Sequence, residues 1–244
     1  MATLFISDLH LCPSRPRTSR LFLDFLAGPA RQARALYILG DLFEYWAGDD
    51  DLDDAFVAGH CKALGELSAC GVRIFFMAGN RDFLAGDGFA RAAGLTLLPE
   101  PAVIDLAGRP TLLLHGDTLC TDDAAYQTFR SEVRSPEWRR SFLALPLAQR
   151  KARIEALRRE SEAQKRAKPL EIMDVNPAAV SRTLTFQRCA RLIHGHTHRP
   201  AHHRFEIDGR PCERWVLPDW DETGGYLSCD EQGCRLFDWP ATVA

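Results

Sequence analysis

Ile193-His194-Gly195-His196-Thr197-His198 closes the series of polar strand ends that decides the fold of this chain. The series begins with Asp8-Leu9-His10, and its middle members are Gly40-Asp41, Gly79-Asn80-Arg81-Asp82 and His115-Gly116-Asp117. Each of these five polar blocks follows an apolar run that is typical of a buried strand. Because the carboxyl ends of strands in an open α/β sheet gather at one crevice, residues far apart in the sequence can converge there. The pattern predicts a hydrolytic metal centre.

Length and composition favour one globular domain over residues 1–244. Of the 244 residues, 46% are hydrophobic and 26% are charged, which is ordinary for a soluble protein. The longest apolar runs, such as the one within residues 73–78, fall far short of the ~20 residues that a spanning helix needs. The first apolar run begins at Leu4 with no basic segment before it, so we expect no secretory signal and a cytosolic protein.

Eight cysteines are scattered along the chain without any Cys-x-x-Cys pair. Because cytosolic thiols stay reduced, we expect them to be free, small, buried side chains. Cys229 and Cys234 flank a predicted hairpin turn, where a disulfide bond is the less favoured alternative.

Strand and helix signals alternate over the first hundred residues, which indicates βαβ units and a largely parallel sheet. Strands are predicted at 3–6, 35–39, 73–77 and 191–193, a hairpin at 103–114, and helices at 18–26, 52–69, 87–93 and 177–187. Asn176 is the predicted N-cap of the last of these helices, with Pro177 at its first position. Segments 202–207, 215–217 and 225–237 predict a closing antiparallel meander.

A basic helical insertion, or lid, is predicted at about residues 121–170. It holds twelve Lys and Arg against seven Asp and Glu, whereas the whole chain has a net charge of −3. Its partly helical apolar spacing predicts helices that break near Pro136 and Pro146. The positive charge favours an anionic partner, which can be a phosphorylated ligand, a nucleic acid or an acidic membrane surface.

Each polar block is a weak signal when it is taken alone. Asp8-Leu9-His10 is by itself typical of a turn aspartate and a surface histidine, and a Gly-Asp pair commonly ends a strand. His196 and His198 are a stronger signal, because imidazole is the commonest nitrogen ligand of transition metals. Five such blocks in order, after five apolar runs, favour a shared site. The remaining histidines are interpreted as structural: His60, His194, His202 and His203.

In this order the five blocks resemble those of the calcineurin-like metallophosphoesterases, whose α/β fold packs two sheets between helices as an αββα sandwich. The resemblance implies two metal ions, one held by Asp8, His10, Asp41 and His198, the other by Asp41, Asn80, His115 and His196. Asp41 would bridge the ions. Two metals ~4 Å apart can activate water and clamp a phosphoryl group. Carboxylate, amide and imidazole ligands without thiolate suit two Mn²⁺ ions, with iron or zinc as alternatives.

Arg81 distinguishes this chain within the family, because members with Gly-Asn-His-Glu, including serine/threonine protein phosphatases, carry histidine there. A guanidinium is a poor proton donor but a good bidentate clamp for phosphate. A leaving group that is itself a phosphate, with a pKa of ~6, departs without a general acid. We therefore expect pyrophosphate cleavage, with Asp41, Asn80, Arg81 and His115 as catalytic residues.

Longer strings narrow the resemblance over nearly the whole chain, at residues 40–46, 115–123, 172–176 and 193–200. They are similar to family members that cleave a UDP-linked diacylated glucosamine in lipid A synthesis. In those proteins water attacks the phosphorus next to uridine and releases UMP and the diacylated sugar 1-phosphate (lipid X). The substrate contacts that the resemblance implies are Asn80, Arg81, Asp123, Ser161, Lys165, Lys168 and His196. Ser161, Lys165 and Lys168 have the spacing of one helical face, but Lys165 stands where some relatives carry asparagine.

A lipid-bearing substrate and a basic lid predict a peripheral protein on the cytoplasmic face of the inner membrane, attached to an anionic surface. We expect no nucleic-acid partner and no obligatory protein partner. Five apolar side chains of the insertion either line an acyl-chain groove or make ordinary helix contacts, and both interpretations stay open: Tyr126, Phe129, Trp138, Phe142 and Leu143.

Two other functions compete with this hypothesis. The same metal centre could act as a nucleotide or nucleic-acid phosphodiesterase, but Arg81 and the acidic remainder of the chain count against that function. A protein-binding scaffold without metals is disfavoured, because a suitable residue stands at all seven ligand positions.

Overall fold

The chain forms two β-sheets and seven α-helices over the described residues, which are 1–167 and 174–240, with backbone only for 160–167 in this computed structural model. The first sheet consists of β1 (Thr3–Ile6), β2 (Ala35–Leu39), β3 (Arg73–Met77), β4 (Thr96–Leu98), β10 (Gly224–Asp230) and β11 (Gly233–Trp239). The second consists of β5 (Ala102–Leu106), β6 (Arg109–Leu113), β7 (Arg191–His194), β8 (Ala201–Ile207) and β9 (Arg210–Val216). The helices are α1 (Pro16–Ala27), α2 (Ala55–Ala69), α3 (Asp87–Ala93), α4 (Ala124–Val133), α5 (Pro136–Leu143), α6 (Leu147–Ala167) and α7 (Pro177–Phe186).

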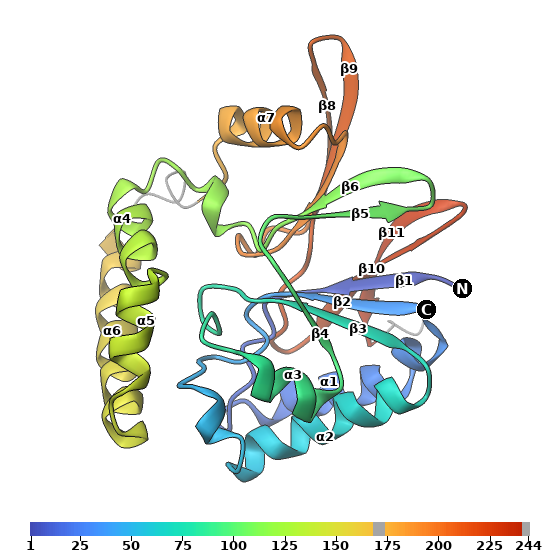
Figure 1. Ribbon diagram of the computed structural model, residues 1–244. Helices are drawn as coiled ribbons and strands as arrows, with labels where there is room; N and C mark the ends of the chain where they lie inside the picture. Colours follow the sequence, from blue (N-terminus) through green and yellow to red (C-terminus); the bar gives the residue numbers. More distant parts are fainter. Residues whose placement is uncertain (168–173, 241–244) are drawn as a thin grey trace.

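The two sheets pack face to face, with α1, α2 and α3 on the outer face of the first and α7 on the outer face of the second (Figure 1). Three apolar layers hold this αββα sandwich together. Strand β1 shows why: Phe5 points into the layer between the sheets, whereas Leu4 and Ile6 point to the helices. Because successive side chains of a strand alternate between its faces, a strand buried on both faces must be apolar throughout. The predicted αββα fold is confirmed.

Parallel strands bring the polar blocks to one end of the molecule. β1, β2, β3 and β4 run parallel in the first sheet, and β6, β7 and β9 run parallel in the second. The blocks follow β1, β2, β3, β6 and β7, so all five leave carboxyl ends of strands. The predicted convergence is therefore built into the topology.

The three helices α4, α5 and α6 stand beside this end of the sandwich (Figure 1). Their start points follow from local chemistry. Ser135 accepts a hydrogen bond from the backbone N–H of Trp138, and Pro136 occupies the first turn of α5, where a missing N–H costs nothing. Pro146 lies directly before α6. The predicted breaks near both prolines are confirmed.

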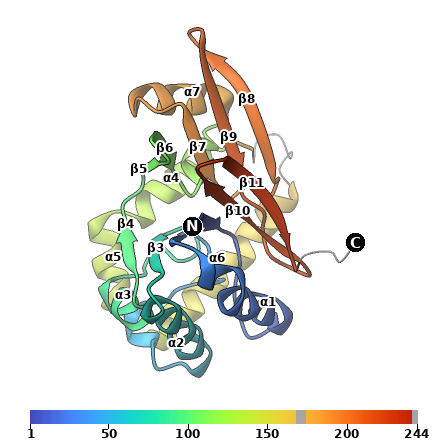
Figure 2. The ribbon, with the colours of Figure 1, turned by 90° about the vertical axis from the view of Figure 1, so that its right-hand side faces the viewer.

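The C-terminal strands differ from the predicted single meander. β8 and β9 form a long antiparallel hairpin in the second sheet that projects past α7 (Figure 2), whereas β10 and β11 form a hairpin at the edge of the first sheet. Sequence patterns show where hairpins form but not which sheet they join, because that choice depends on the partner strand.

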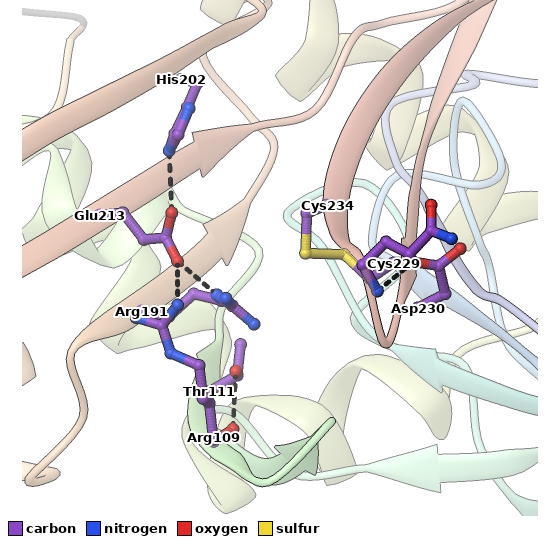
Figure 3. The surroundings of a disulfide bond; sticks show 9 residues. Arg109, Thr111, Arg191, His202, Glu213, Cys229, Asp230 and Cys234 are labelled. Atoms are coloured by element: carbon purple, nitrogen blue, oxygen red, sulfur yellow. Dashed lines mark hydrogen bonds and ion pairs between the residues drawn. A yellow bond between two sulfur atoms is a disulfide. The ribbon is translucent and has the colours of Figure 1, made fainter.

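The expectation that all eight cysteines are free is also wrong. Cys229 and Cys234 form a disulfide bond across the β10–β11 hairpin (Figure 3). The two residues are directly paired across the strands, with Cα atoms 4.1 Å apart, so the hairpin brings the sulfur atoms together. The other six cysteines form no disulfide bond, as expected, but Cys70 is exposed and Cys12 is half-buried, so the predicted burial holds for only four of them.

Within residues 1–167 and 174–240, no helix has the length and apolar character required to cross a bilayer.

Candidate metal centre and substrate groove

The turns after the strands hold the predicted ligands in an unusual backbone conformation. Asp8, His10, Asp41, His196 and His198 all have positive φ, between 50° and 68°. Residues with a Cβ atom rarely adopt this left-handed region, and such strained residues cluster at functional sites. The local backbone is therefore bent to aim these side chains toward one point.

The first group of ligand atoms comes from both ends of the chain. Asp8, His10 and His198 each offer an atom within 4.8 Å of the others. The Nε2 atoms of His10 and His198 are 3.4 Å apart, and Nε2 of His198 lies 3.5 Å from Oδ1 of Asp8. This arrangement brings together three of the four residues predicted for one metal ion, and Asp41 follows at 3.9 Å from Nε2 of His10.

The second group surrounds the other oxygen of Asp41. Nε2 of His115 lies 3.7 Å from Oδ1 of Asp41 and 3.0 Å from Oδ1 of Asn80. The ring of His196 packs against the ring of His115, with centroids 5.1 Å apart. Asp41 therefore stands between the two groups, with Oδ2 toward His10 and Oδ1 toward His115.

Neighbouring oxygen atoms orient three of the histidines. Nδ1 of His115 donates to the carbonyl of Leu39 at 2.9 Å, Nδ1 of His10 lies 3.1 Å from Glu44, and Nδ1 of His198 lies 3.3 Å from Asp219. In each ring this contact leaves Nε2 directed at the other candidate ligands. Such outer contacts fix the tautomer of metal-binding histidines in proteins. Glu44 and Asp219 were not predicted from the sequence.

Asp82 holds together the two turns that carry Asp41 and Asn80. Its fully buried carboxylate accepts hydrogen bonds from the backbone N–H groups of Leu42 and Gly79, both at 2.8 Å. Asp82 belongs to one of the five polar blocks, but no role for it was predicted. Its signal was its place in the Gly-Asn-Arg-Asp string.

Close backbone approach explains Gly195. A Cβ atom at this position would lie 2.2 Å from Oδ2 of Asp8 and 2.2 Å from Oγ of Ser7. The space is needed because Oδ2 of Asp8 accepts a hydrogen bond from the backbone N–H of His196 at 2.8 Å. Glycine thus allows the turn that follows β7 to fold against Asp8.

Electrostatics at the site favour cations. Burial alone would raise the pKa of Asp8, but His198 and the other neighbouring histidines hold it well below its usual range. Burial would lower the pKa of His115, yet Asp41 and Asp8 outweigh it and raise this pKa to about 9. His196 differs, because burial and then the nearby His115 lower its pKa to about 4. The carboxylates thus draw positive charge into a buried site.

These residues fit divalent metal ions. Oδ1 of Asp8 is buried, and within the part of the chain that the structure describes it has no hydrogen-bond partner. Nε2 of His198 lies 3.5 Å from this atom, and a buried carboxylate oxygen without a hydrogen bond is costly unless a cation satisfies it. Oxygen and imidazole donors on two sides of Asp41 are the ligand types that such ions take in hydrolytic enzymes. The site therefore has the donors of a divalent metal centre.

A groove of about 550 Å³ leads from this centre along the helical insertion. Asn80, Arg81, His196 and His198 line its polar end. Its walls carry apolar side chains: Phe83, Phe129, Val133, Trp138, Phe142 and Leu157. Of the five apolar residues named from the sequence, Tyr126, Phe129, Trp138 and Phe142 line the groove, and Leu143 is not among its lining residues.

The predicted substrate contacts are only partly described. Arg81 and Asp123 line the groove, where the guanidinium of Arg81 lies 3.9 Å from Glu44. Arg158 of α6, which was not predicted, donates to the same carboxylate at 2.5 Å. The side chains of Ser161 and Lys165, and the whole of Lys168, lie outside the described residues. His194 lies apart from the candidate ligands: its ring donates to the carbonyl of Gly195 and contacts Arg214.

Comparisons with known proteins agree with this geometry. The model of the calcineurin-like phosphoesterase family matches residues 1–200. UDP-2,3-diacylglucosamine hydrolase of Aromatoleum aromaticum is 56% identical over 236 residues, which cover 96% of this chain and 95% of that protein. Proteins of the same name from Cellvibrio japonicus and Pseudomonas aeruginosa are 51% identical and cover 98% of this chain, with 99% and 100% of their own lengths. With this match and a metal-type centre at the predicted strand ends, the chain belongs to the calcineurin-like phosphoesterase family.

Proposed function

We propose that this chain hydrolyses the pyrophosphate bond of UDP-2,3-diacylglucosamine and releases UMP and 2,3-diacylglucosamine 1-phosphate. The observation that carries the proposal is the groove, which joins a cluster of metal-type ligands to an apolar wall. The groove therefore has a polar end and an apolar end, which match the pyrophosphate and the acyl chains of this substrate. The relatives that share at least half of their residues with this chain carry the matching name.

The proposed cofactors are two Mn²⁺ ions. Asp8, His10, Asp41 and His198 would hold one, and Asp41, Asn80, His115 and His196 would hold the other. Ions at these positions would supply positive charge for the phosphoryl oxygens and would activate the attacking water.

The chain's own groups would bind the phosphates and place them. Arg81 and Arg158 both reach Glu44 at the polar end of the groove, so their guanidinium groups are held where a pyrophosphate would enter. Bidentate donors bind phosphate with defined geometry. Because the leaving group is a sugar 1-phosphate, no side chain has to protonate it, which is consistent with arginine rather than histidine at position 81.

The remaining substrate contacts would come from the insertion, which we propose acts as a lid on a single domain of residues 1–244. Asp123 lies at the N-cap of α4 and lines the groove. Ser161, Lys165 and Lys168 are proposed to present a hydroxyl and two cations to the headgroup. The apolar wall would take the acyl chains, whose burial contributes about 0.8 kcal/mol per CH₂.

We also propose that the protein works at the cytoplasmic face of the inner membrane without an obligatory protein partner. The excess of Lys and Arg in residues 121–170 would attract anionic lipid, at ~1 kcal/mol for each cation close to the surface. Flotation with anionic vesicles at low salt tests this proposal. Failure to float, with or without substrate, would contradict it.

The decisive assay for the reaction is Mn²⁺-dependent release of UMP from UDP-2,3-diacylglucosamine by the purified protein. We expect turnover with Mn²⁺ and none after chelation. Hydrolysis of simple phosphodiesters without UMP release would instead support a nucleotide or nucleic-acid phosphodiesterase. Loss of all hydrolysis with Mn²⁺ bound would refute both enzymatic functions.

A further inference from the structure

Two buried carboxylates lie between the second sheet and helix α4, outside the candidate ligand set. Glu100 precedes β5 and has a side chain 7% exposed, and Asp117 follows the His115 turn with a side chain 0% exposed. Charged groups buried to this degree need partners, because unpaired burial is strongly unfavourable. Both partners come from the helical insertion.

Arg130 of α4 bridges the two carboxylates. Its Nε donates to Oδ2 of Asp117 at 2.7 Å, and its terminal nitrogen donates to Oε2 of Glu100 at 2.7 Å. Arg134, one turn further along α4, lies 3.8 Å from each carboxylate and donates to the carbonyl of Gly79 at 2.8 Å. We call Glu100, Asp117, Arg130 and Arg134 the α4 anchor. It ties the first helix of the insertion to turns of both sheets.

The α4 anchor and its neighbour Tyr126 contact two of the candidate ligands, His115 and His196. Oε1 of Glu100 accepts a hydrogen bond from the backbone N–H of His115 at 2.8 Å. Tyr126 of α4 donates to Oδ2 of Asp117 at 2.7 Å, and its ring stacks on His196 with centroids 6.2 Å apart. One face of α4 thus contacts the anchor and the metal-type centre, while Phe129 and Val133 contribute to the groove wall.

We propose that Arg130 is a positioning residue that fixes α4, and with it the apolar groove wall, at a set place relative to the metal-type centre. This inference rests on the proposed function, because a fixed groove wall matters only if the site binds acyl chains and a pyrophosphate at the same time. Arg130 also lines the groove, but its guanidinium nitrogens are engaged by Asp117 and Glu100. It acts through α4.

The forked guanidinium is what the geometry requires. One side chain must donate to two carboxylates on different segments, and a lysine ammonium, which is a single point charge without a planar fork, cannot reproduce both contacts. Arg134 pairs with both carboxylates only at 3.8 Å and donates its hydrogen bond to Gly79, so it does not supply the two bonds of 2.7 Å that Arg130 makes. His115 remains held by Leu39 and Glu100 when Arg130 is absent. We therefore expect metal binding to persist in Arg130 variants.

The test compares Arg130→Met and Arg130→Lys with Arg140→Met. Arg140 lies in α5 of the same insertion, has a side chain 78% exposed and pairs only with the exposed Glu137 among the contacts described for it. Each purified variant is assayed for kcat/KM on UDP-diacylglucosamine with two long acyl chains and with two short ones, and for Mn²⁺ affinity. Hydrogen exchange of the α4 amides is measured on the same samples.

A long-chain substrate must seat on the groove wall, whereas a short-chain one reaches the centre without it. We expect Arg130→Met to lower long-chain kcat/KM by ~100-fold, the cost typical of a 1 Å misplacement, and short-chain kcat/KM by much less. Arg130→Lys should fall between, which keeps the test informative if the Met variant folds poorly. Amides of α4 should exchange faster in both Arg130 variants, with Mn²⁺ affinity within about threefold of wild type. Arg140→Met should match wild type.

An equal loss on both substrates would overturn the proposal, because a merely structural role lowers the fraction of folded enzyme for either substrate. Loss of Mn²⁺ affinity would also overturn it, since Arg130 would then act through the metal ligands. If wild type cleaves neither substrate, the proposed function fails. Hydrogen exchange still decides the anchor: unchanged exchange in α4 refutes it, and faster exchange supports it.

Discussion

Replacing Asp82 with asparagine should affect metal binding and activity more than it affects the free energy of unfolding. The carboxylate accepts two backbone hydrogen bonds of 2.8 Å, from Leu42 and Gly79. Hydrogen bonds to a charged group contribute ~1.5–3 kcal/mol each, so the pair contributes about 3–6 kcal/mol. Burial and then repulsion by Asp41 nevertheless raise the pKa of Asp82 from 3.8 to about 6, although these hydrogen bonds act in the opposite direction.

Because burial and Asp41 disfavour the ionised carboxylate in the folded protein, we expect Asp82→Asn to lose only part of the hydrogen-bond contribution and to lower the free energy of unfolding of the metal-free protein by no more than about 3 kcal/mol. For a chain of this size that corresponds to a fall in Tm of at most ~10 °C. Two longer bonds, from the N–H groups of Asp41 and Phe43, also reach this carboxylate, so each of its oxygens accepts from two donors. The amide NH₂ of asparagine would therefore face two of these N–H groups and would push apart the turns that carry Asp41 and Asn80. We expect Mn²⁺ affinity or activity to fall by ~10–100-fold.

Calorimetry of the metal-free protein, a Mn²⁺ titration and UMP release together measure these quantities. The matched control is Asp105→Asn, which removes a similar carboxylate bond to the backbone N–H of Gly108 in the exposed β5–β6 turn.

The pH dependence of the free energy of unfolding gives a further test. Because the folded pKa of Asp82 is raised, its favourable contribution is complete below pH 3.8 and is lost as pH rises through about 6. The deficit of the variant should therefore be larger at pH 4 than at pH 7. Normal Mn²⁺ binding with a large loss of stability would refute this reasoning.

Further substitutions test the other parts of the site. Asp41→Ala should abolish activity, because both ligand groups lose their shared carboxylate, and residual turnover above the chelated control would contradict a bridge. Arg81→Ala should lower turnover while Mn²⁺ stoichiometry, measured by titration, stays normal; metal loss would show that Arg81 supports the ligands instead. Gly195→Ala should displace Asp8, weaken Mn²⁺ binding and cost ~1–3 kcal/mol in urea unfolding, and an unchanged affinity would argue against close packing here. Burial lowers the pKa of His60, so its contribution is complete above pH 6.5 and is lost as pH falls toward the folded pKa. Urea unfolding of His60→Leu should then show a smaller loss of stability between pH 6.5 and pH 5 than wild type, and equal slopes would count against this assignment.

Much of the fold could be read from local sequence because local chemistry determines it. The strands at 3–6 and 73–77 and the helix at 87–93 have the predicted bounds. Asn176 caps α7 through the N–H groups of Ala178 and Ala179, as predicted. Short or edge elements were missed, such as the three-residue β4. Their pairing depends on a neighbouring strand rather than on their own pattern.

The residues of the site also include some that could be predicted from the sequence and some that could not. Candidate ligands could be named because metal-type residues follow five predicted strands and because the resemblance to the family assigns seven of them to two ions. Glu44, Asp82 and Asp219 could not, since their importance lies in an imidazole or a backbone N–H that each one meets only in the folded chain. The disulfide bond between Cys229 and Cys234 was predicted wrongly for a related reason. An expected cytosolic location disfavours disulfide bonds, but the register of β10 and β11 places these two cysteines directly opposite each other.

The pairing of His10 with His198 has a consequence for how the protein is made. Their Nε2 atoms are 3.4 Å apart, although 188 residues separate them in the chain. At a synthesis rate of ~5–20 residues per second, His10 is synthesised roughly 10–40 s before its partner. During that interval Asp8 and His10 have no complete coordination sphere to join. The four ligands proposed for this ion can therefore come together only after residue 198 has been synthesised.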